Sequence, residues 1–196
     1  MKHLVIFTSL VLVFAALCCV MPTRADTEIY SKVLRLHVIA NSDSEHDQNL
    51  KLRVRDAVLG KIDKMTEGAA DIGDASRIVA ENVEEIRALV SGTLKSLGED
   101  ETAAVTLSEE YYPERSYGDI SLPAGKYASL RIMLGKAEGQ NWWCVLYPSV
   151  CLSGAKASSV FKQTGFSTEQ INVLTEDEKP VYKIKFKILE LIGAGA

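Results

Sequence analysis

The sequence has 196 residues, of which 47% are hydrophobic and 24% are charged. These values are near those of ordinary globular proteins, and the length suits a single domain. The formal net charge is −4 and no basic block is present, so the composition argues against a nucleic-acid binder and against a long disordered chain.

The first 25 residues have the pattern of a secretory signal peptide. Lys2 precedes an apolar run without charges over residues 4–20, and residues 23–25 (Thr-Arg-Ala) resemble a cleavage site. We therefore expect residues 1–25 to be removed on export and residues 26–196 to form one domain. The alternative is an uncleaved anchor, because the run is about as long as a short membrane-spanning helix.

The four cysteines fall into two groups. Cys18 and Cys19 lie in the N-terminal apolar run, whereas Cys144 and Cys151 remain in the domain. An even number of cysteines in an exported chain favours a disulfide, which in so short a loop would stabilise the fold by roughly 2–3 kcal/mol. The alternative is two free, buried thiols. A zinc site is not expected, because no third ligand lies near the two sulfurs.

An alternating apolar run predicts the first strand. Leu34, Leu36 and Val38 alternate with Arg35 and His37, which is the period-two pattern of a strand with one buried face. We therefore place Arg35 and His37 on the face away from the core.

A polar turn at residues 41–43 (Asn-Ser-Asp) follows this strand and leads into an amphipathic helix that ends before Gly68. Ser44 precedes Asp47 at the spacing of a helix capping box. Lys51 and Arg55 then follow Asp47 one turn apart, which predicts ion pairs along one helix face. Turn and cap chemistry explains these residue types, although sites in α/β proteins also form where strands end.

A second helix is predicted to begin after Asp71 or Asp74, either of which can cap it, and to end at Gly98. Gly92 lies inside it and weakens it by about 1 kcal/mol relative to alanine. The apolar positions recur in steps of three and four, the period of an amphipathic helix. They are Val79, Val83, Ile86, Val90, Leu94 and Leu97.

From Thr102 onward the pattern changes to strands and turns. Alternation predicts strands over residues 102–107 and 127–134. A short strand is predicted at 119–122, and the strongly apolar, aromatic residues 142–147 predict another. A short helix is predicted to start after Ser167, and residues 181–192 fit either a strand or a helix. The order strand–helix–helix–strand–strand–strand predicts an α+β fold, in which two amphipathic helices pack on one face of a mainly antiparallel sheet.

None of the familiar catalytic motifs is present. The sequence has no G-x-S-x-G, no H-E-x-x-H and no glycine-rich phosphate loop. His37, Asp43, His46 and Asp47 match no standard set of metal ligands. The residue patterns therefore do not favour a catalytic site, and we expect no metal and no cofactor.

The pair Trp142-Trp143 is the clearest candidate for a contact surface. Neighbouring side chains of a strand point to opposite faces. One ring is therefore expected to anchor the core and the other to lie near the surface, where tryptophan is favoured at interfaces. The alternative is that both rings are covered.

Two blocks of sequence resemble the stage II sporulation protein R family. The first is RLHVIANSDS at residues 35–44, with DQ at 47–48 and LKLRVRD at 50–56. The second is YPERSYG at 112–118, LPAG at 122–125 and GQNWWC at 139–144, completed by the cysteine pair. Residues 147–151 read Tyr-Pro-Ser-Val-Cys where Phe-Pro-Pro-Leu-Cys is expected, a departure that keeps the cysteine. The resemblance covers most of residues 26–196.

The resemblance implies a signalling protein rather than an enzyme. Members of the family are made in the forespore of endospore-forming bacteria and are exported into the space between forespore and mother cell. There they activate a membrane-embedded aspartic protease, which processes the precursor of the mother-cell factor sigma-E. Contact with a membrane would then occur only through this partner or through an uncleaved signal.

A binding role directs attention to exposed aromatic residues and to the polar turn. The candidate contact residues are His37, Asn41, Asp43, Asp47, Arg55, Tyr117, Trp142 and Trp143. Two alternatives remain open. One is a secreted hydrolase acting on the cell wall, for which Glu109-Glu110 is the nearest pair of carboxylates. The other is a structural module held at the wall or membrane by an uncleaved signal.

Overall fold

The computed structural model describes residues 2–20, 28–151 and 156–175. The chain divides into two compact units, one of residues 29–176 and one of residues 1–28 and 177–196. The second of these contains the helix α1 (Lys2–Val20). In the described part of the chain, no helix is long and apolar enough to cross a membrane. Cleavage after residue 25 stays a prediction, and residues 181–192 lie outside the described residues.

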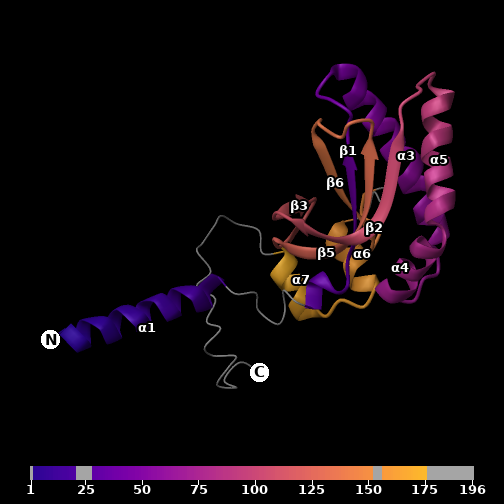
Figure 1. The fold of residues 1–196 in the computed structure, drawn as a ribbon. Coiled ribbons are helices and arrows are strands. Elements are labelled where there is room, and N and C mark those ends of the chain that lie inside the picture. Colours follow the sequence, from indigo (N-terminus) through magenta and orange to yellow (C-terminus); the bar gives the residue numbers. More distant parts are fainter. Residues whose placement is uncertain (1, 21–27, 152–155, 176–196) are drawn as a thin grey trace. The chain divides into compact units, whose positions relative to one another are not determined.

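Residues 29–176 form an α+β structure around a four-stranded sheet (Figure 1). The strands are β1 (Leu34–Ile39), β2 (Ala103–Tyr112), β3 (Arg115–Tyr117), β4 (Ile120–Leu122), β5 (Gly125–Leu134) and β6 (Asn141–Tyr147). The sheet order is β2-β5-β1-β6, and β3 and β4 make a separate hairpin. Only the β1–β5 pair is parallel among these described strands. The predicted α+β class and mainly antiparallel sheet are confirmed.

One face of the sheet is covered by the helices α3 (Glu45–Met65), α4 (Ile72–Glu81) and α5 (Val83–Ser96). The prediction of one continuous second helix is wrong, because the chain breaks between α4 and α5 at Asn82. The side chain of Asn82 donates to the backbone oxygen of Ile78 at 2.8 Å. The apolar spacing continues through this break, so periodicity alone does not reveal it.

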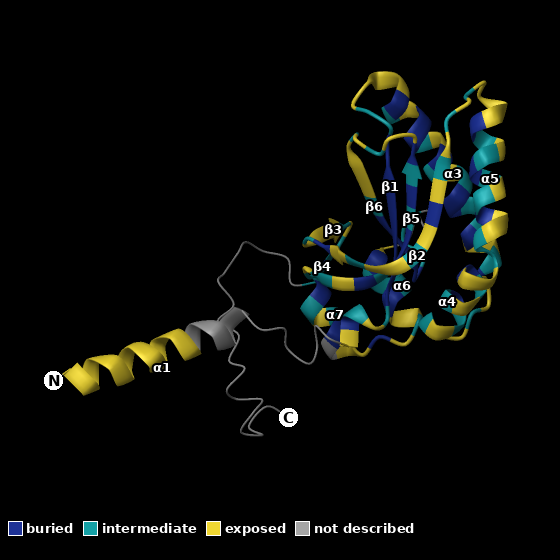
Figure 2. Cartoon of the chain, viewed as in Figure 1, coloured by how far each residue is buried: buried dark blue, intermediate teal, exposed yellow. Residues whose placement is uncertain are grey.

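The opposite face carries a second core. The hairpin β3–β4 packs there with α6 (Ala157–Gln163) and α7 (Thr168–Thr175). Strand β1 is therefore buried on both faces, as Figure 2 shows. Arg35 is fully buried and His37 is only 6% exposed. The prediction that these two side chains lie away from the core is wrong, because segments distant in sequence cover the second face.

The connection from β5 to β6 crosses the end of β1, since β1 lies between those two strands. Side chains of the polar turn hold this connection. The Asn41 Oδ1 atom accepts from the backbone N–H of Lys136 at 2.9 Å, and the Asp43 Oδ1 atom accepts from that of Gln140 at 2.7 Å. Asn41 and Asp43 thus have a structural role, which satisfies backbone groups that would otherwise lack partners.

The helix α3 begins with half of the predicted capping box. Ser44 Oγ accepts from the backbone N–H of Asp47 at 3.1 Å. The Asp47 carboxylate does not complete the box but turns back to the loop, where it accepts from Ser42 Oγ at 2.6 Å and from Asn41 Nδ2 at 3.1 Å. These hydrogen bonds fix the angle between β1 and α3.

The predicted ion-pair ladder along α3 is wrong. Lys51 Nζ donates to the backbone oxygen of Gln140 at 2.9 Å, which ties α3 to the crossover connection. Arg55 instead pairs with its neighbour Asp56, with 2.6 Å between Nη2 and Oδ1. Local spacing favours the ladder, but tertiary partners compete for the same side chains.

Candidate interaction site

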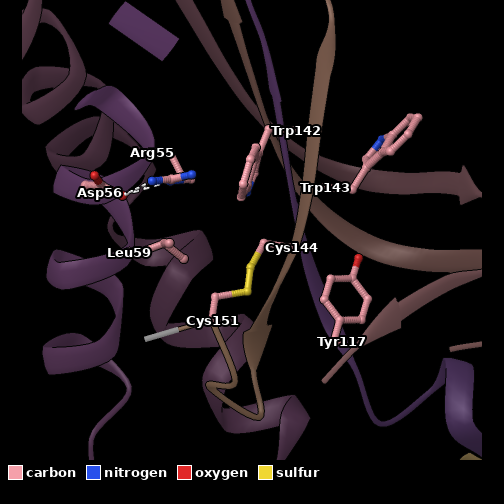
Figure 3. Close-up of a pocket in the computed structure, with 8 residues that line it drawn as sticks. All are labelled: Arg55, Asp56, Leu59, Tyr117, Trp142, Trp143, Cys144 and Cys151. Atoms are coloured by element: carbon pink, nitrogen blue, oxygen red, sulfur yellow. Dashed lines mark hydrogen bonds and ion pairs between the residues drawn. A yellow bond between two sulfur atoms is a disulfide. The ribbon is translucent and has the colours of Figure 1, made fainter. Parts of the chain in front are cut away.

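A cavity of about 220 Å³ lies beside β6, between α3 and β3 (Figure 3). Its lining residues come from three separate elements and one loop. They are Arg55, Asp56 and Leu59 of α3, Tyr117 of β3, Trp142, Trp143 and Cys144 of β6, and Cys151. Four of the predicted contact residues are thus gathered here, namely Arg55, Tyr117, Trp142 and Trp143.

Trp142 faces α3. Its ring centroid lies 4.3 Å from the guanidinium carbon of Arg55, which is within the range of a cation–π contact. The Trp142 side chain is nevertheless 38% exposed. An aromatic ring that is held by a cation yet open to solvent can contact a partner without losing much conformational entropy.

Trp143 points to the opposite face of β6 and packs beside the second core. Its ring lies 5.6 Å from that of His37, and the guanidinium carbon of Arg115 lies 4.3 Å from its centroid. The predicted opposite orientation of the two tryptophans is confirmed. Trp143 is the core-anchored ring of the pair, and Trp142 is the exposed one.

The predicted disulfide between Cys144 and Cys151 is present and lines the cavity, with 6.4 Å between the two Cα atoms. The Sγ atom of Cys151 also accepts from the backbone N–H of Val145 at 3.3 Å. The disulfide therefore fixes the loop after β6 against the strand itself.

Arg35 supports the cavity wall from inside. Its guanidinium carbon lies 4.1 Å from the ring centroid of Tyr112, 4.9 Å from that of Tyr127 and 5.3 Å from that of Tyr117. Its Nη2 donates to the Tyr117 hydroxyl, and its Nε donates to the Cys144 oxygen at 3.3 Å. Arg35 therefore links the β3–β4 hairpin to β6. Local sequence patterns do not reveal this role of Arg35, and the tyrosines among residues 111–117 are the only signal of an aromatic cage.

The cage provides no negative charge for Arg35. Burial raises the pKa of both Tyr112 and Tyr117 above that of an ordinary tyrosine, so their hydroxyls stay protonated. The Nη1 atom of Arg35 has no hydrogen-bond partner among the described residues. The cation is therefore held by ring faces and two hydrogen bonds.

His37 is enclosed by protein groups. Its Nδ1 lies 2.7 Å from Glu110 Oε1, and its Nε2 lies 2.7 Å from Asn141 Oδ1. Glu110 also accepts from Ser129 Oγ at 3.1 Å. His37 thus joins β1 to β2 and β6. Within residues 2–20, 28–151 and 156–175, no group of three or more His, Cys, Asp and Glu side chains is placed to hold a metal.

The remaining predicted contact residues do not line the cavity. Asn41, Asp43 and Asp47 form the turn after β1, and His37 is buried beside Trp143. Their observed role is structural, and contact with a partner stays a prediction for all eight residues.

Comparison with known proteins now identifies the family. Residues 30–157 match the family model described as stage II sporulation protein R (spore_II_R). The chain belongs to this family. A curated relative named stage II sporulation protein R, from Bacillus subtilis (strain 168), is 32% identical over 168 residues, which cover 86% of this chain and 70% of the relative. No solved structure matches the chain.

The family assignment confirms the resemblance seen in the sequence. The matched span contains every residue that lines the cavity. Membership in the stage II sporulation protein R family supports a role in sporulation.

Proposed function

We propose that the chain is an exported signalling protein of endospore formation that activates a membrane-embedded aspartic protease. Activation would trigger processing of the sigma-E precursor in the mother cell. The observation that carries the proposal is the family match over residues 30–157. The partly exposed Trp142 within that span supports it, because it offers an aromatic contact of the kind that dominates protein interfaces.

The proposed route is export from the forespore into the space between forespore and mother cell. The charged start, apolar run and small residues of 1–25 support this route. Contact with the membrane is through the protease, or through residues 1–25 if they are retained.

The proposed mechanism is a shift between two states of the protease. A ligand activates its receptor only to the extent that it binds the active form more tightly than the inactive one. A 100-fold preference, about 2.8 kcal/mol, would move a mostly inactive population close to half active or beyond. The chain needs no catalytic group of its own for this effect.

The competing hypothesis of a cell-wall hydrolase gains no support from the His37–Glu110 pair. That pair has the distance of a hydrogen-bonded acid and base. However, Asn141 occupies the second ring nitrogen of His37, and the imidazole is only 6% exposed. A polysaccharide substrate could not reach it without opening of the sheet.

Reconstitution tests the proposal directly. The protease and the sigma-E precursor are co-expressed in a non-sporulating host with and without the full chain, and precursor cleavage is followed. Cleavage is expected only with the chain and only with a catalytically intact protease. Cleavage with an inactive protease would make the chain itself the peptidase. No cleavage with all proteins folded and located as proposed would overturn the signalling role.

A further inference from the structure

We propose that the outer edge of β6 is a docking strand that binds an extended, acidic segment of the partner protein by adding it to the sheet. The partner's identity rests on the proposed function, whereas the docking edge and its chemistry rest on the geometry of β6. Such strand addition draws affinity from main-chain hydrogen bonds and specificity from the flanking side chains.

The edge of β6 offers outward backbone groups before Val145 that no described strand pairs. β6 is the outermost strand of the sheet, and no described strand pairs with its outer side. The N–H of Val145 points outward, because it donates to Sγ of Cys151, in the loop that follows the strand. Peptide groups alternate in direction along an antiparallel strand. The N–H and C=O of Trp143 therefore also point outward, away from β1.

The cavity flanks this edge on both sides. Its walls are α3, which carries Arg55, and β3, which carries Tyr117. Trp142 and Trp143 point to opposite faces of β6 (Figure 3). Side chains of an added strand alternate in the same way, so successive residues of the segment would meet Trp142 on one face and Trp143 on the other.

Charge selects the chemistry of the segment. Arg55 lies on the ring of Trp142, and Arg115 lies on that of Trp143. Arg35 adds a third positive charge behind Tyr117. Asp56 supplies the one carboxylate of the cavity lining, and it pairs with Arg55. The positive charge that no ion pair of the described residues offsets therefore comes from Arg115 and from the buried Arg35. The surplus of positive charge favours aspartate or glutamate side chains in the docked segment.

The same charges disfavour two other occupants. The chain's own residues 181–192 alternate apolar residues with Lys183, Lys185 and Lys187, which would approach the arginines. A second copy of the chain would bring like charges together when two β6 edges pair. Like charges at an interface oppose association, so an acidic partner fits better than either.

A proline substitution tests the backbone pairing. Trp143→Pro and Trp143→Ala both remove the ring, but only proline removes the outward N–H, and an edge strand tolerates proline at such a position. Binding of the exported full chain to the protease in lipid nanodiscs is expected to weaken about 30-fold with alanine and a further 3- to 10-fold with proline. If Trp143→Pro and Trp143→Ala both fold and bind the protease with equal affinity, the proposal of strand addition is overturned.

Charge reversal tests the same proposal without altering the strand. Arg115→Glu and Arg55→Glu are each expected to weaken binding at least 10-fold, and the loss should shrink at high salt. Arg53→Glu is the matched control, because Arg53 is exposed on α3 but does not line the cavity. If Arg115→Glu and Arg55→Glu bind the protease as tightly as Arg53→Glu does, the proposal that the docked segment is acidic is overturned.

A peptide probe separates the docking edge from the proposed function. The probes are a six-residue peptide that alternates valine with glutamate and the same peptide with lysine in place of glutamate. Hydrogen exchange of the Trp143 amide in the full chain is expected to slow only with the glutamate peptide. Protection by the glutamate peptide, together with failed protease activation, would reject the proposed function and keep the docking edge.

The remaining outcomes of the probe overturn the docking proposal. Protection by the lysine peptide would assign the edge to the chain's own residues 181–192. Protection without peptide, rising with protein concentration and dimer formation, would assign it to a second copy. No protection by either peptide would show that the edge does not accept an added strand.

Discussion

The guanidinium of Arg35 lies over the ring of Tyr112, with 4.1 Å from its central carbon to the ring centroid. The side chain is fully buried, and none of the ion pairs among the described residues involves it. A buried cation without a carboxylate is expensive to desolvate. The contribution of Arg35 to stability should therefore come from its volume and stem more than from its charge.

Replacing Arg35 tests this view. Arg35→Met keeps most of the volume and removes the charge, so the free energy of unfolding should stay within about 1 kcal/mol of wild type. Arg35→Ala leaves a cavity and should lower it by about 3 kcal/mol. Urea unfolding measures both, with exposed Arg53→Met as control. A loss with methionine as large as that with alanine would show that the cation–π contacts stabilise the fold.

The glycine at the crossover connection should resist substitution. A Cβ atom on Gly139 would lie 2.2 Å from the backbone oxygen of Ser42, whereas nothing lies within 4 Å of one on Gly92 in α5. Gly139→Ala should lower the free energy of unfolding by about 2 kcal/mol, since backbone must move. Gly92→Ala should raise it by about 0.5–1 kcal/mol. Thermal unfolding of both variants checks the pair, and a harmless Gly139→Ala would contradict the close approach.

Asp47 should make stability depend on acidity. Hydrogen bonds from Ser42, and also from Asn41 and Ser44, hold the pKa of Asp47 below its ordinary value of 3.8, although burial opposes them. The unfolded chain therefore binds the proton more readily than the folded one. The stabilisation is complete above the ordinary value and is lost as the pH falls through the folded pKa.

Asp47→Asn measures that contribution. The variant should lose about 1–2 kcal/mol at pH 7 and should lose less than wild type on further acidification. Urea unfolding between pH 7 and pH 2 measures the slope. Glu45→Gln, a change at an exposed position in the same helical turn, is the control. Parallel slopes for Asp47→Asn and wild type would mean that Asp47 is not a source of the acid dependence.

Removing the disulfide should weaken the fold without abolishing it. The double variant Cys144→Ala/Cys151→Ala opens a short loop, for which chain entropy gives a loss of about 2–3 kcal/mol. Cys151 also accepts from the Val145 N–H, so exchange of that amide should accelerate. Chemical denaturation and hydrogen exchange follow the two effects. Unchanged stability would show that the surrounding packing already restricts the loop.

The two tryptophans should differ in their effect on stability. Trp142→Ala removes an exposed ring and should lower the free energy of unfolding by less than about 1 kcal/mol. Trp143→Ala removes packing against His37 and the second core and should lower it by about 2–3 kcal/mol. Under the proposed function, both should weaken protease binding. If each variant loses protease binding only in proportion to the fraction of it that is unfolded, neither ring is part of the interface.

Local patterns in the sequence located most elements. Alternation placed β1 and β5, an apolar and aromatic run placed β6, and the polar turn marked the start of α3. These features depend on near neighbours, so a single sequence carries them. The break at Asn82 escaped because the apolar spacing on its two sides is in phase. The opposite orientation of Trp142 and Trp143 also followed from strand geometry alone.

The site itself depended on contacts between distant segments. The sequence provided the residue types, the cysteine pair and the family motifs. Its local pattern, however, predicted that β1 has one buried face and one face exposed to solvent. The tertiary structure closed the second face with α6, α7 and the β3–β4 hairpin and so buried Arg35 and His37. It also decided that β6 is an edge strand between α3 and β3. Periodicity reports which side of one element is apolar, whereas the order of strands depends on which surfaces pack together, and that information is distributed over the whole chain.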